Sequence, residues 1–478
     1  MAPSLPLSSL LVARFLRSNN YTETLDAFIR EAGLPSDAGE TTEIELSSEP
    51  AGADQWTLEG IIQEKKRFDQ SLTFERHDES TSAKDQWTSL APSQPTVVDT
   101  PSSTNLLHVS VQPWQRSDKE STSYVVATGA DKRLSLFNLD ADRTVAVSMM
   151  QLSDSPILSH ASVCEGRYQF LTGMSGKLLL VQNDEVIDYR KDHSKYTVQV
   201  TAYEDQDGHI WIATAGWDAQ VLLYRMKIEP SPVIGEPVGA IKLATNPESI
   251  LITRNPDTQE LTLLVSRRDS THIYFYNLEV LRGANSTTTN NNTTVQCEEI
   301  GKQNLAPHSN AWVAFSPSCL ALSPHDPGLL AVALSTMPHM KVIIVRLLFP
   351  SQQTSTEEQN ESASVSQAAQ AMAALALQNR EDAAIVIQAN TFAPQTPYST
   401  PQVVWRPDGS GVWVNGDDGV IRGVEAKTGK VVTMLKNGHE VGSKVRSIWA
   451  GWVWSEEDSR KEEWVVSGGF DKRLIVWR

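Results

Sequence analysis

The pattern of hydrophobic and polar residues divides the chain into a short helical part and a long β-rich part. Between Ser8 and Leu34, apolar residues recur every three or four positions on both sides of a polar break at Ser18-Asn19-Asn20. This spacing predicts two short amphipathic helices. From about residue 105 to the C-terminus, short apolar runs are separated by Asp, Gly and Pro. Such runs predict many β-strands joined by turns.

The two helices are too short to bury both of their apolar faces, so we expect a partner surface, most simply a second copy of the chain. Their spacing resembles the LisH motif, through which members of that family dimerise. The resemblance implies dimer contacts at Leu11, Phe15, Leu16, Tyr21, Thr24, Phe28 and Glu31. Asn20 replaces the usual Gly, and Asn also tolerates a left-handed backbone. The alternative is a helical hairpin that packs on the same chain and leaves it monomeric.

Further boundaries follow from changes in composition. We assign the hairpin to residues 1–35, a linker to 36–55, an amphipathic helix to 56–77 and a second, Pro-containing linker to 78–104. The repeat region covers 105–478 and has polar inserts near 284–296 and 351–382. The first insert has the composition of a disordered loop. The second contains strong helix formers, so a partner-bound helix and an ordinary insertion both stay open.

Within residues 105–478, the strand-like runs recur in the same order. The phrase Asp-Lys-Arg-Leu begins at Asp131 and again at Asp471, and each time it lies between two apolar runs. The order resembles WD repeats, with seven copies that start near residues 105, 155, 193, 245, 308, 397 and 438. The resemblance implies a mainly β fold, a seven-bladed WD-repeat β-propeller preceded by the small α-helical LisH-like module.

The WD-repeat resemblance also implies a polar network inside a blade. An Asp in the turn between the second and third strands binds a His before the first strand, and the His binds Ser or Thr, which contacts an aromatic residue. These positions are His439, Ser467, Asp471 and Trp477 in the last copy, and His193, Thr214, Asp218 and Tyr224 in the third. Because each His recurs with its Asp at repeat spacing, we interpret both as structural and not as catalytic or metal-binding residues.

The resemblance further implies that the last repeat supplies three strands of its blade and that the fourth comes from elsewhere in the chain. The segment "PTVVDT", residues 95–100, is the candidate for this strand. Its pairing would leave no open sheet edge.

Composition and motifs narrow the classes of function. The chain has 478 residues and a formal net charge of −17, so we expect no direct binding to nucleic acid. No apolar run approaches a membrane span, and we expect no membrane association. The three cysteines have no metal-site spacing and are typical of a reducing compartment, so we expect the cytoplasm, the nucleus or both. No phosphate-binding, nucleophile or metalloprotease motif occurs, and we expect no cofactor, metal or enzymatic activity.

The sequence therefore predicts a non-enzymatic, homodimeric scaffold or adaptor that presents propellers for protein–protein interaction in a multi-subunit assembly. Candidate partner-binding residues lie in or beside turns between second and third strands: Lys132, Arg133, Trp217, Arg268, Asp418, Lys472 and Arg473. Each of them could instead only solvate its turn. The alternatives are a ubiquitin-ligase substrate-recruiting subunit, a chromatin corepressor and, from another class, an enzyme with its active site in the propeller channel.

Overall fold

The computed structural model describes residues 7–39, 87, 89–116, 120–140, 144–228, 232–283, 294–307, 315–350, 367–455 and 460–478. The chain forms two compact units, residues 1–76 and 77–478. The amphipathic helix predicted for residues 56–77 and most of the linker predicted for 36–55 lie outside the described residues.

The first unit contains the predicted pair of helices, α1 (Leu7–Ser18) and α2 (Thr22–Ala32). Asn20, between them, has the left-handed backbone expected at that position, with φ 59°. Gly33 ends α2 in the same region of backbone space, and its N–H donates to the carbonyl of Ile29. The core of this unit consists of Ala13, Leu25, Leu34 and Ala38.

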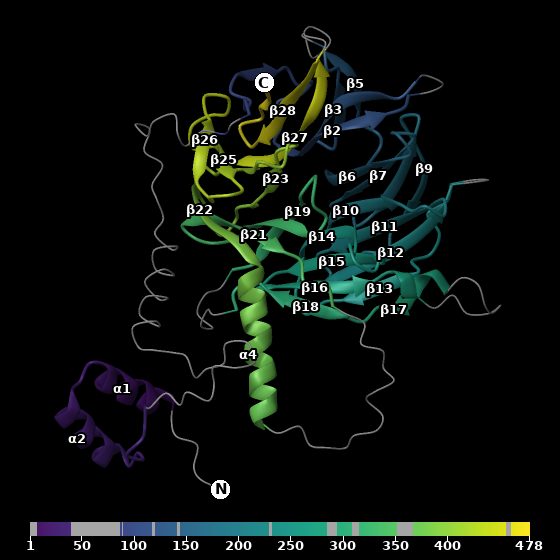
Figure 1. The fold of residues 1–478 in the computed structure, drawn as a ribbon. Coiled ribbons are helices and arrows are strands. Elements are labelled where there is room, and N and C mark those ends of the chain that lie inside the picture. Colours follow the sequence, from purple (N-terminus) through teal and green to yellow (C-terminus); the bar gives the residue numbers. More distant parts are fainter. Residues whose placement is uncertain are drawn as a thin grey trace. The chain divides into compact units, whose positions relative to one another are not determined.

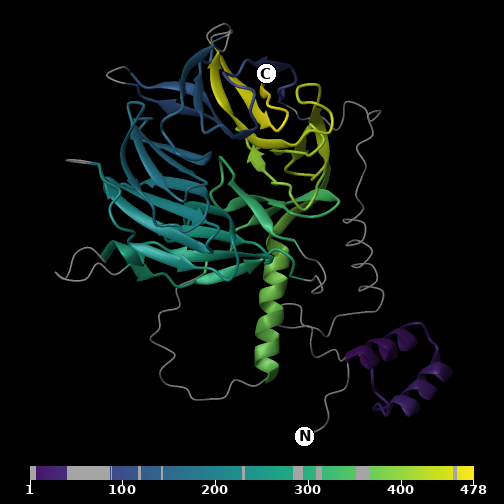
Figure 2. The ribbon, with the colours of Figure 1, turned by 180° about the vertical axis from the view of Figure 1, so that it is seen from behind.

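The second unit is a ring of antiparallel sheets (Figures 1 and 2). Blade 1 consists of β2 (Leu106–Trp114), β3 (Thr122–Gly129), β4 (Leu134–Phe137) and β5 (Val145–Met149). Blade 2 consists of β6 (Ile157–Val163), β7 (Tyr168–Gly173), β8 (Leu178–Gln182) and β9 (Glu185–Arg190). Blade 3 consists of β10 (Thr197–Glu204), β11 (His209–Gly216), β12 (Gln220–Lys227) and β13 (Gly239–Lys242). Blade 4 consists of β14 (Pro247–Arg254), β15 (Leu261–Arg267), β16 (His272–Asn277) and β18 (Gly301–Asn304), with the short 3₁₀ helix η4 (Glu279–Gly283) after β16.

The ring continues through three more blades. Blade 5 consists of β19 (Pro317–Leu322), β20 (Leu329–Leu334), β21 (His339–Arg346) and β22 (Ile385–Pro394), and blade 6 of β23 (Val403–Trp405), β24 (Gly411–Val414), β25 (Ile421–Glu425) and β26 (Val431–Leu435). Blade 7 consists of β27 (Val445–Ser455), β28 (Arg460–Gly469), β29 (Leu474–Trp477) and β1 (Pro95–Val98). The described strands thus form seven blades, and the predicted seven-bladed propeller is confirmed.

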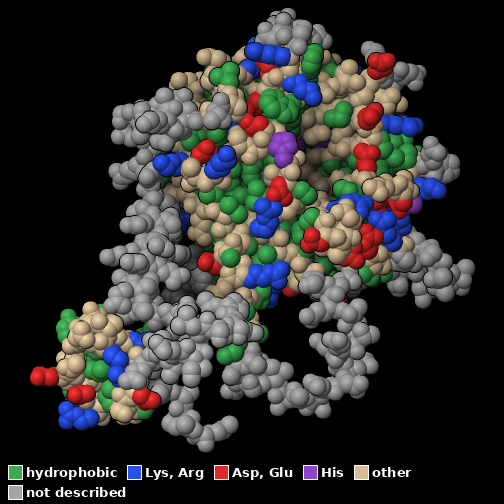
Figure 3. Space-filling model, in the orientation of Figure 1, with side chains coloured by type: hydrophobic (Ala, Val, Ile, Leu, Met, Phe, Trp, Pro, Cys, Tyr) green, Lys and Arg blue, Asp and Glu red, His purple; other side chains and the backbone are tan. Residues whose placement is uncertain are grey.

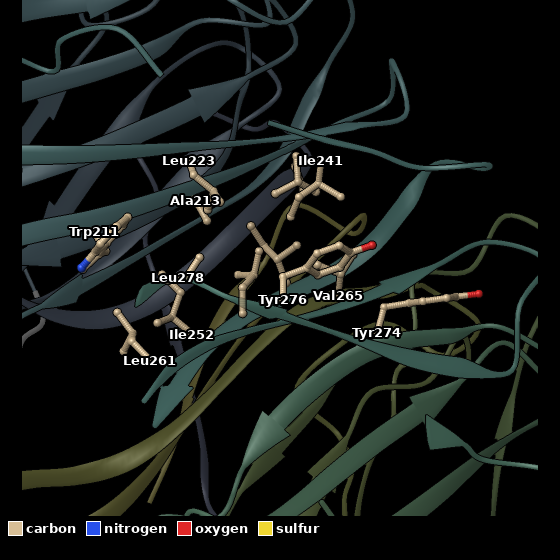
Figure 4. Close-up of a cluster of buried hydrophobic side chains, with 14 of the residues drawn as sticks. Trp211, Ala213, Leu223, Ile241, Ile252, Leu261, Val265, Tyr274, Tyr276 and Leu278 are labelled. Carbon is tan, nitrogen blue, oxygen red and sulfur yellow. The ribbon is translucent and has the colours of Figure 1, made fainter. Parts of the chain in front are cut away.

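The blades pack face to face through apolar side chains. Figure 4 shows one such core, where Trp211 and Leu223 of blade 3 lie with Val265 and Tyr276 of blade 4. Since successive side chains of a strand point to opposite faces of its sheet, a strand between two neighbouring blades needs apolar residues at every position. The run from Leu474 to Trp477 is therefore buried throughout.

Blade 7 is completed by the segment proposed from the sequence. Strand β1 pairs antiparallel with β29, with Pro95 opposite Trp477 and Val98 opposite Leu474. Just beyond, Arg478 and Gln94 exchange both backbone hydrogen bonds, at 3.1 and 3.0 Å. The two distant parts of the chain are thereby joined within one sheet, and the ring closes.

The residues just before β1 differ from the linker predicted for 78–104. The ring of Trp87 lies edge-on to Trp413, with centroids 5.0 Å apart, and the Arg406 guanidinium lies 4.3 Å from its centroid. Arg406 is itself buried and bonds to Glu463 at 2.5 Å. The polar composition of this segment predicted a linker, but its residue Trp87 packs against side chains of blade 6.

Both inserts contain regular structure in their described parts. Helix α4 (Gln367–Ala384) runs directly into β22 and projects from the ring in Figure 1. Its residues Met372, Leu375 and Leu377 are exposed. In the first insert, β17 (Val295–Gln296) pairs in parallel with β13. The last two residues of the predicted loop near 284–296 are therefore a short strand.

The closure can be tested with two adjacent residues of β1. The side chain of Val98 is 5% exposed and lies in the core of blades 7 and 1, whereas that of Val97 is 55% exposed. We expect Val98→Asp to lower the free energy of unfolding by about 3 kcal/mol, because it buries an unpaired charge. Val97→Asp should change it by less than about 1 kcal/mol. Denaturant unfolding followed by tryptophan fluorescence measures both, and equal effects would contradict closure through β1.

Candidate functional site

The two copies of the Asp-Lys-Arg-Leu phrase form the same turn in blades 1 and 7. Lys132 and Lys472 have φ angles of 70° and 69°. In each turn, the backbone N–H of the following Arg donates to the Asp Oδ1 at 3.3 Å. The repeated phrase is thus explained by one local geometry between the second and third strands, with the Lys side chain exposed in both copies.

The polar network predicted for blade 7 is present. His439 Nδ1 lies 3.0 Å from Asp471 Oδ2, and its Nε2 lies 2.9 Å from Ser467 Oγ. The indole N–H of Trp477 donates to the same Ser467 Oγ at 2.9 Å. Burial disfavours the charged form of Asp471, but its hydrogen bonds with His439 and two backbone N–H groups outweigh burial and lower its pKa. These side chains bind one another and hold the blade together.

Blade 3 contains a second network of this kind. His193 Nδ1 lies 3.0 Å from Asp218 Oδ1, and its Nε2 lies 2.9 Å from Thr214 Oγ1. Tyr224, in the position of Trp477, differs because its hydroxyl donates to Asp192 Oδ2 at 3.0 Å. A phenol has its donor at the far end of the ring, whereas the indole N–H lies at the ring edge, so the two side chains reach different acceptors.

Two candidate partner-binding residues from neighbouring blades lie together. The Arg268 guanidinium is 5.8 Å from the ring of Trp217, and Trp217 lies 5.8 Å from the ring of Tyr196. Trp217 is 38% exposed, and Tyr196 is exposed as well. We call Tyr196, Trp217 and Arg268 the aromatic cluster. The sequence did not indicate Tyr196, because a single exposed aromatic residue before a strand has no periodic signal.

Three of the five other charged candidates are paired within or beside their own turns, whereas Lys132 and Lys472 are exposed. Arg133 pairs with Asp131 at 3.1 Å, Asp418 with Arg422 at 2.6 Å and Arg473 with Glu440 at 3.1 Å. These pairs favour the interpretation that the three residues stabilise and solvate their turns.

Comparison with known proteins agrees with this geometry. Residues 115–478 match the family described as "UCP007778, beta-propeller domain", and residues 9–36 match "UCP007778, LisH domain". The chain belongs to the UCP007778 family. It is similar to "Uncharacterized protein YGR117C" of Saccharomyces cerevisiae, with 22% identity over 377 residues, which cover 71% of this chain and 74% of the yeast protein. LisH and propeller domains generally mediate protein–protein interaction.

The LisH domain of this UCP007778 chain leaves several predicted contact residues at its surface. Leu11 is buried, but Phe15, Leu16 and Phe28 are only partly buried. The ring of Tyr21 is 53% exposed and lies 6.3 Å from that of Phe15. The last two predicted residues, Thr24 and Glu31, are exposed. Among the described residues of this small domain, several aromatic and aliphatic side chains are thus only partly covered.

The propeller also contains a charged pocket of about 650 Å³, lined among others by Asp205, Arg254 and Arg282. Both arginines bind the buried Asp205, at 2.7 and 2.5 Å. Figure 3 shows acidic and basic side chains side by side over the region of β10 to β14. The pocket lies at turns between first and second strands, at the opposite end of the blades from the aromatic cluster, and its ion pairs join blades 3 and 4.

The three cysteine thiols have raised pKa values. Burial raises the pKa of Cys164 to about 11 and also raises the pKa values of Cys297 and Cys319. A nucleophilic cysteine needs the opposite shift. Within the described ranges, no cluster of three or more His, Cys, Asp or Glu side chains could hold a metal ion. The helices in the same ranges include none long and apolar enough to span a membrane.

The two Asp-Lys-Arg-Leu turns allow a matched test of the polar network. Asp471 is fully buried against His439, whereas Asp131 is partly exposed and accepts a hydrogen bond from Ser102 at 2.6 Å. Asp471→Ala should lower the free energy of unfolding by about 3 kcal/mol, since it leaves buried His439 without its acceptor. Asp131→Ala should lower it by about 1 kcal/mol or less. Denaturant titration compares them, and a larger loss at Asp131 would refute a stabilising network in blade 7.

Proposed function

We propose that this UCP007778 chain is a non-enzymatic, homodimeric scaffold whose propellers bind partner proteins. The observation that carries the proposal is the small core of the LisH domain. Ala13, Leu25, Leu34 and Ala38 form that core, and two of these four side chains are alanines. The larger Leu16, Phe28 and Ile29 pack against it only partly buried. Complete burial of a Leu or Phe side chain contributes about 1.5–3 kcal/mol, so a second copy would supply the missing stabilisation.

Dimerisation through this domain would change how strongly the propellers hold a partner. Two linked propellers convert the second contact with a bivalent partner into an intramolecular step. Weak contacts at each propeller then combine into a tight assembly. This is the mechanism that we propose for the scaffold.

The aromatic cluster supports a binding surface at the blade ends that carry the turns between second and third strands. Trp, Tyr and Arg are the residues most enriched among those that dominate binding energy at interfaces. Arg268 is held over Trp217 by a cation–π contact and by Glu248 at 2.7 Å. A partner therefore meets side chains that are already ordered.

An enzymatic role has less support than the scaffold, because the three partly buried thiols have raised pKa values. Ubiquitin-ligase recruitment and corepression are assemblies in which such a scaffold would fit, and no described residue favours one over the other. The cysteines are free, which supports a reducing compartment, the cytoplasm or the nucleus. The net charge of −17 argues against direct binding to nucleic acid.

Dimerisation is tested by light scattering on the full chain. We expect a mass of twice 52.7 kDa for the native sequence and for the control Tyr398→Asp, which alters an exposed ring of the propeller. Phe28→Asp and the milder Tyr21→Asp should yield 52.7 kDa, because a charge opposes burial of the LisH surface. Tyr21 is exposed, so its variant keeps the domain core. A native chain at the monomer mass would disprove the homodimer.

The propeller contact is tested by affinity purification from cells that express the chain, followed by quantitative mass spectrometry. Trp217→Ala should reduce recovery of a defined partner set by about tenfold or more, as loss of a dominant aromatic contact does. Trp452→Ala removes an exposed indole from β27 and serves as the control. Equal recovery with both variants would exclude the aromatic cluster as the binding surface.

A further inference from the structure

The innermost strands of the propeller are linked to one another by a repeated contact. At the start of an inner strand, one side chain reaches the backbone of the next inner strand around the ring. The contacts are Ser159 with Val200 N–H (3.2 Å), Gln199 with Ile250 N–H (2.9 Å), Ser249 with Leu320 N–H (3.3 Å), Cys319 with Val403 C=O (3.7 Å), Gln402 with Ile448 N–H (3.1 Å) and Ser447 with Val109 N–H (3.0 Å). Six junctions between described strands therefore share one device.

The seventh junction, between β2 and β6, is different. His108 stands where the other blades have Ser, Gln or Cys, and its ring lies edge-on to His160, with centroids 5.3 Å apart. His160 is 6% exposed, and no described residue forms a hydrogen bond with either of its ring nitrogens. Because a neutral imidazole has one N–H donor and one acceptor nitrogen, His160 has an unused donor and an unused acceptor in the wall of the ring.

The cationic side chain of Arg446 lies beside this pair. Arg446 is the extra residue of a β-bulge between the buried Val445 and Ser447. Strand β27 is an edge strand of its sheet, so the bulge places Arg446 at that edge, where its charge acts on His108. Because Ser447 binds the N–H of Val109, Arg446 lies next to His108. Arg446 forms no ion pair with any described residue.

The corresponding bulges elsewhere do not compensate this charge. In β2, β6 and β10 they carry Leu107, Leu158 and Val198. In β14 the residue is Glu248, which is already bound to Arg268 at 2.7 Å. Figure 3 shows a hollow near the middle of the propeller.

We propose that Arg446, His108 and His160, at the inner junction of blades 7, 1 and 2, bind a carboxylate group. A carboxylate accepts two hydrogen bonds from a guanidinium and has lone pairs left for an imidazole N–H. Its single negative charge matches the single cation. A phosphate dianion would need a second cation, which the described lining does not offer.

The protonation states agree with this charge count. Burial and the nearby Arg446 lower the pKa of His108 to about 4, and burial lowers that of His160 to about 3. Both imidazoles are thus neutral at neutral pH, and Arg446 supplies the charge. The carboxylate belongs either to an acidic segment of a partner protein or to a small carboxylate ion. The site shares no residue with the LisH domain or the aromatic cluster. Its test can therefore fail without contradicting the proposed dimer or the proposed partner contact.

Fluorescence anisotropy of the full chain with a fluorescein-labelled hexaglutamate peptide tests this site. We expect saturable binding that Arg446→Gln weakens about tenfold or more, as for the loss of a charge-assisted pair. Arg446→Lys keeps the charge but loses the two-point geometry and should retain part of the affinity. Arg346→Gln removes an equal charge from an ion pair in blade 5 and should leave the affinity within about twofold.

A second variant separates binding from folding. His108→Gln introduces a glutamine, the residue that blades 3 and 6 have at the equivalent position, Gln199 and Gln402. It should restore the missing contact to the backbone of β6, keep or raise the unfolding temperature, and still weaken the peptide about threefold or more through loss of the imidazole. Unchanged affinity in Arg446→Gln and His108→Gln, or no saturable binding to the native chain, would overturn the proposal.

Two further probes identify the source of the carboxylate. If glutarate displaces the peptide from the native chain, and Arg446→Gln weakens glutarate as it weakens the peptide, the ligand is a small ion. Failure of excess glutarate to displace it, with Arg446-dependent peptide binding, supports a partner segment. A hexapeptide with phosphoserines in place of the glutamates should bind more weakly, and tighter binding that depends on Arg446 would overturn the assignment to a carboxylate.

Discussion

The pairing of β1 with β29 is the constraint on which the rest of the propeller depends. Every blade buries both of its faces against neighbours, so an incomplete blade 7 would leave a sheet edge and two apolar interfaces poorly covered. The closure continues beyond the strand, because Trp87 is held between Trp413 and the Arg406 guanidinium. Arg406 is in turn paired with buried Glu463, so that Trp87, blade 6 and blade 7 share one set of contacts. Closure also brings the inner strands together in a circle, which is the reason that their starting residues can bind the next strand.

The sequence predicted those features that repeat. The turn at Asp131 and Asp471 and the networks around His193 and His439 recur at fixed spacing, so a local pattern identifies them without knowledge of contacts. The closing strand followed from the WD-repeat resemblance, which implies that the last repeat supplies only three strands of its blade. In contrast, the positions of Trp87, Tyr196 and Arg446 become meaningful only through neighbours that the fold brings close to them. A bulge adds one residue to one strand, and its effect on a side chain becomes visible only when its partner strand is placed.

The positions that depart from the repeat are also those with unused binding capacity. Where the ring requires a bridge, six junctions between described strands use a small or amide side chain and satisfy both partners. Where His108 and His160 replace that bridge, two buried ring nitrogens are left without a partner and a cation stands nearby. A buried polar group without a partner lowers stability, so a ligand that satisfies it recovers this free energy on binding. The stability of the fold and the affinity for a ligand thus compete at the same junction.

The two proposed contacts of the propeller differ in what they require of a partner. The aromatic cluster is exposed and preformed, and it offers two mutually tilted rings and one guanidinium. Arg446 and the histidines lie in the inner wall, and only a narrow group that reaches toward the ring axis can bind them. Since the inner strands begin at the end of the blades that carries the turns between second and third strands, both contacts face the same side of the ring. A partner that binds both sites must combine an apolar face for the aromatic cluster with a carboxylate side chain that reaches Arg446. A partner without this carboxylate leaves the donors of Arg446 and the histidines unpaired. Discrimination between partners would then come from the inner site and most of the contact area from the outer one.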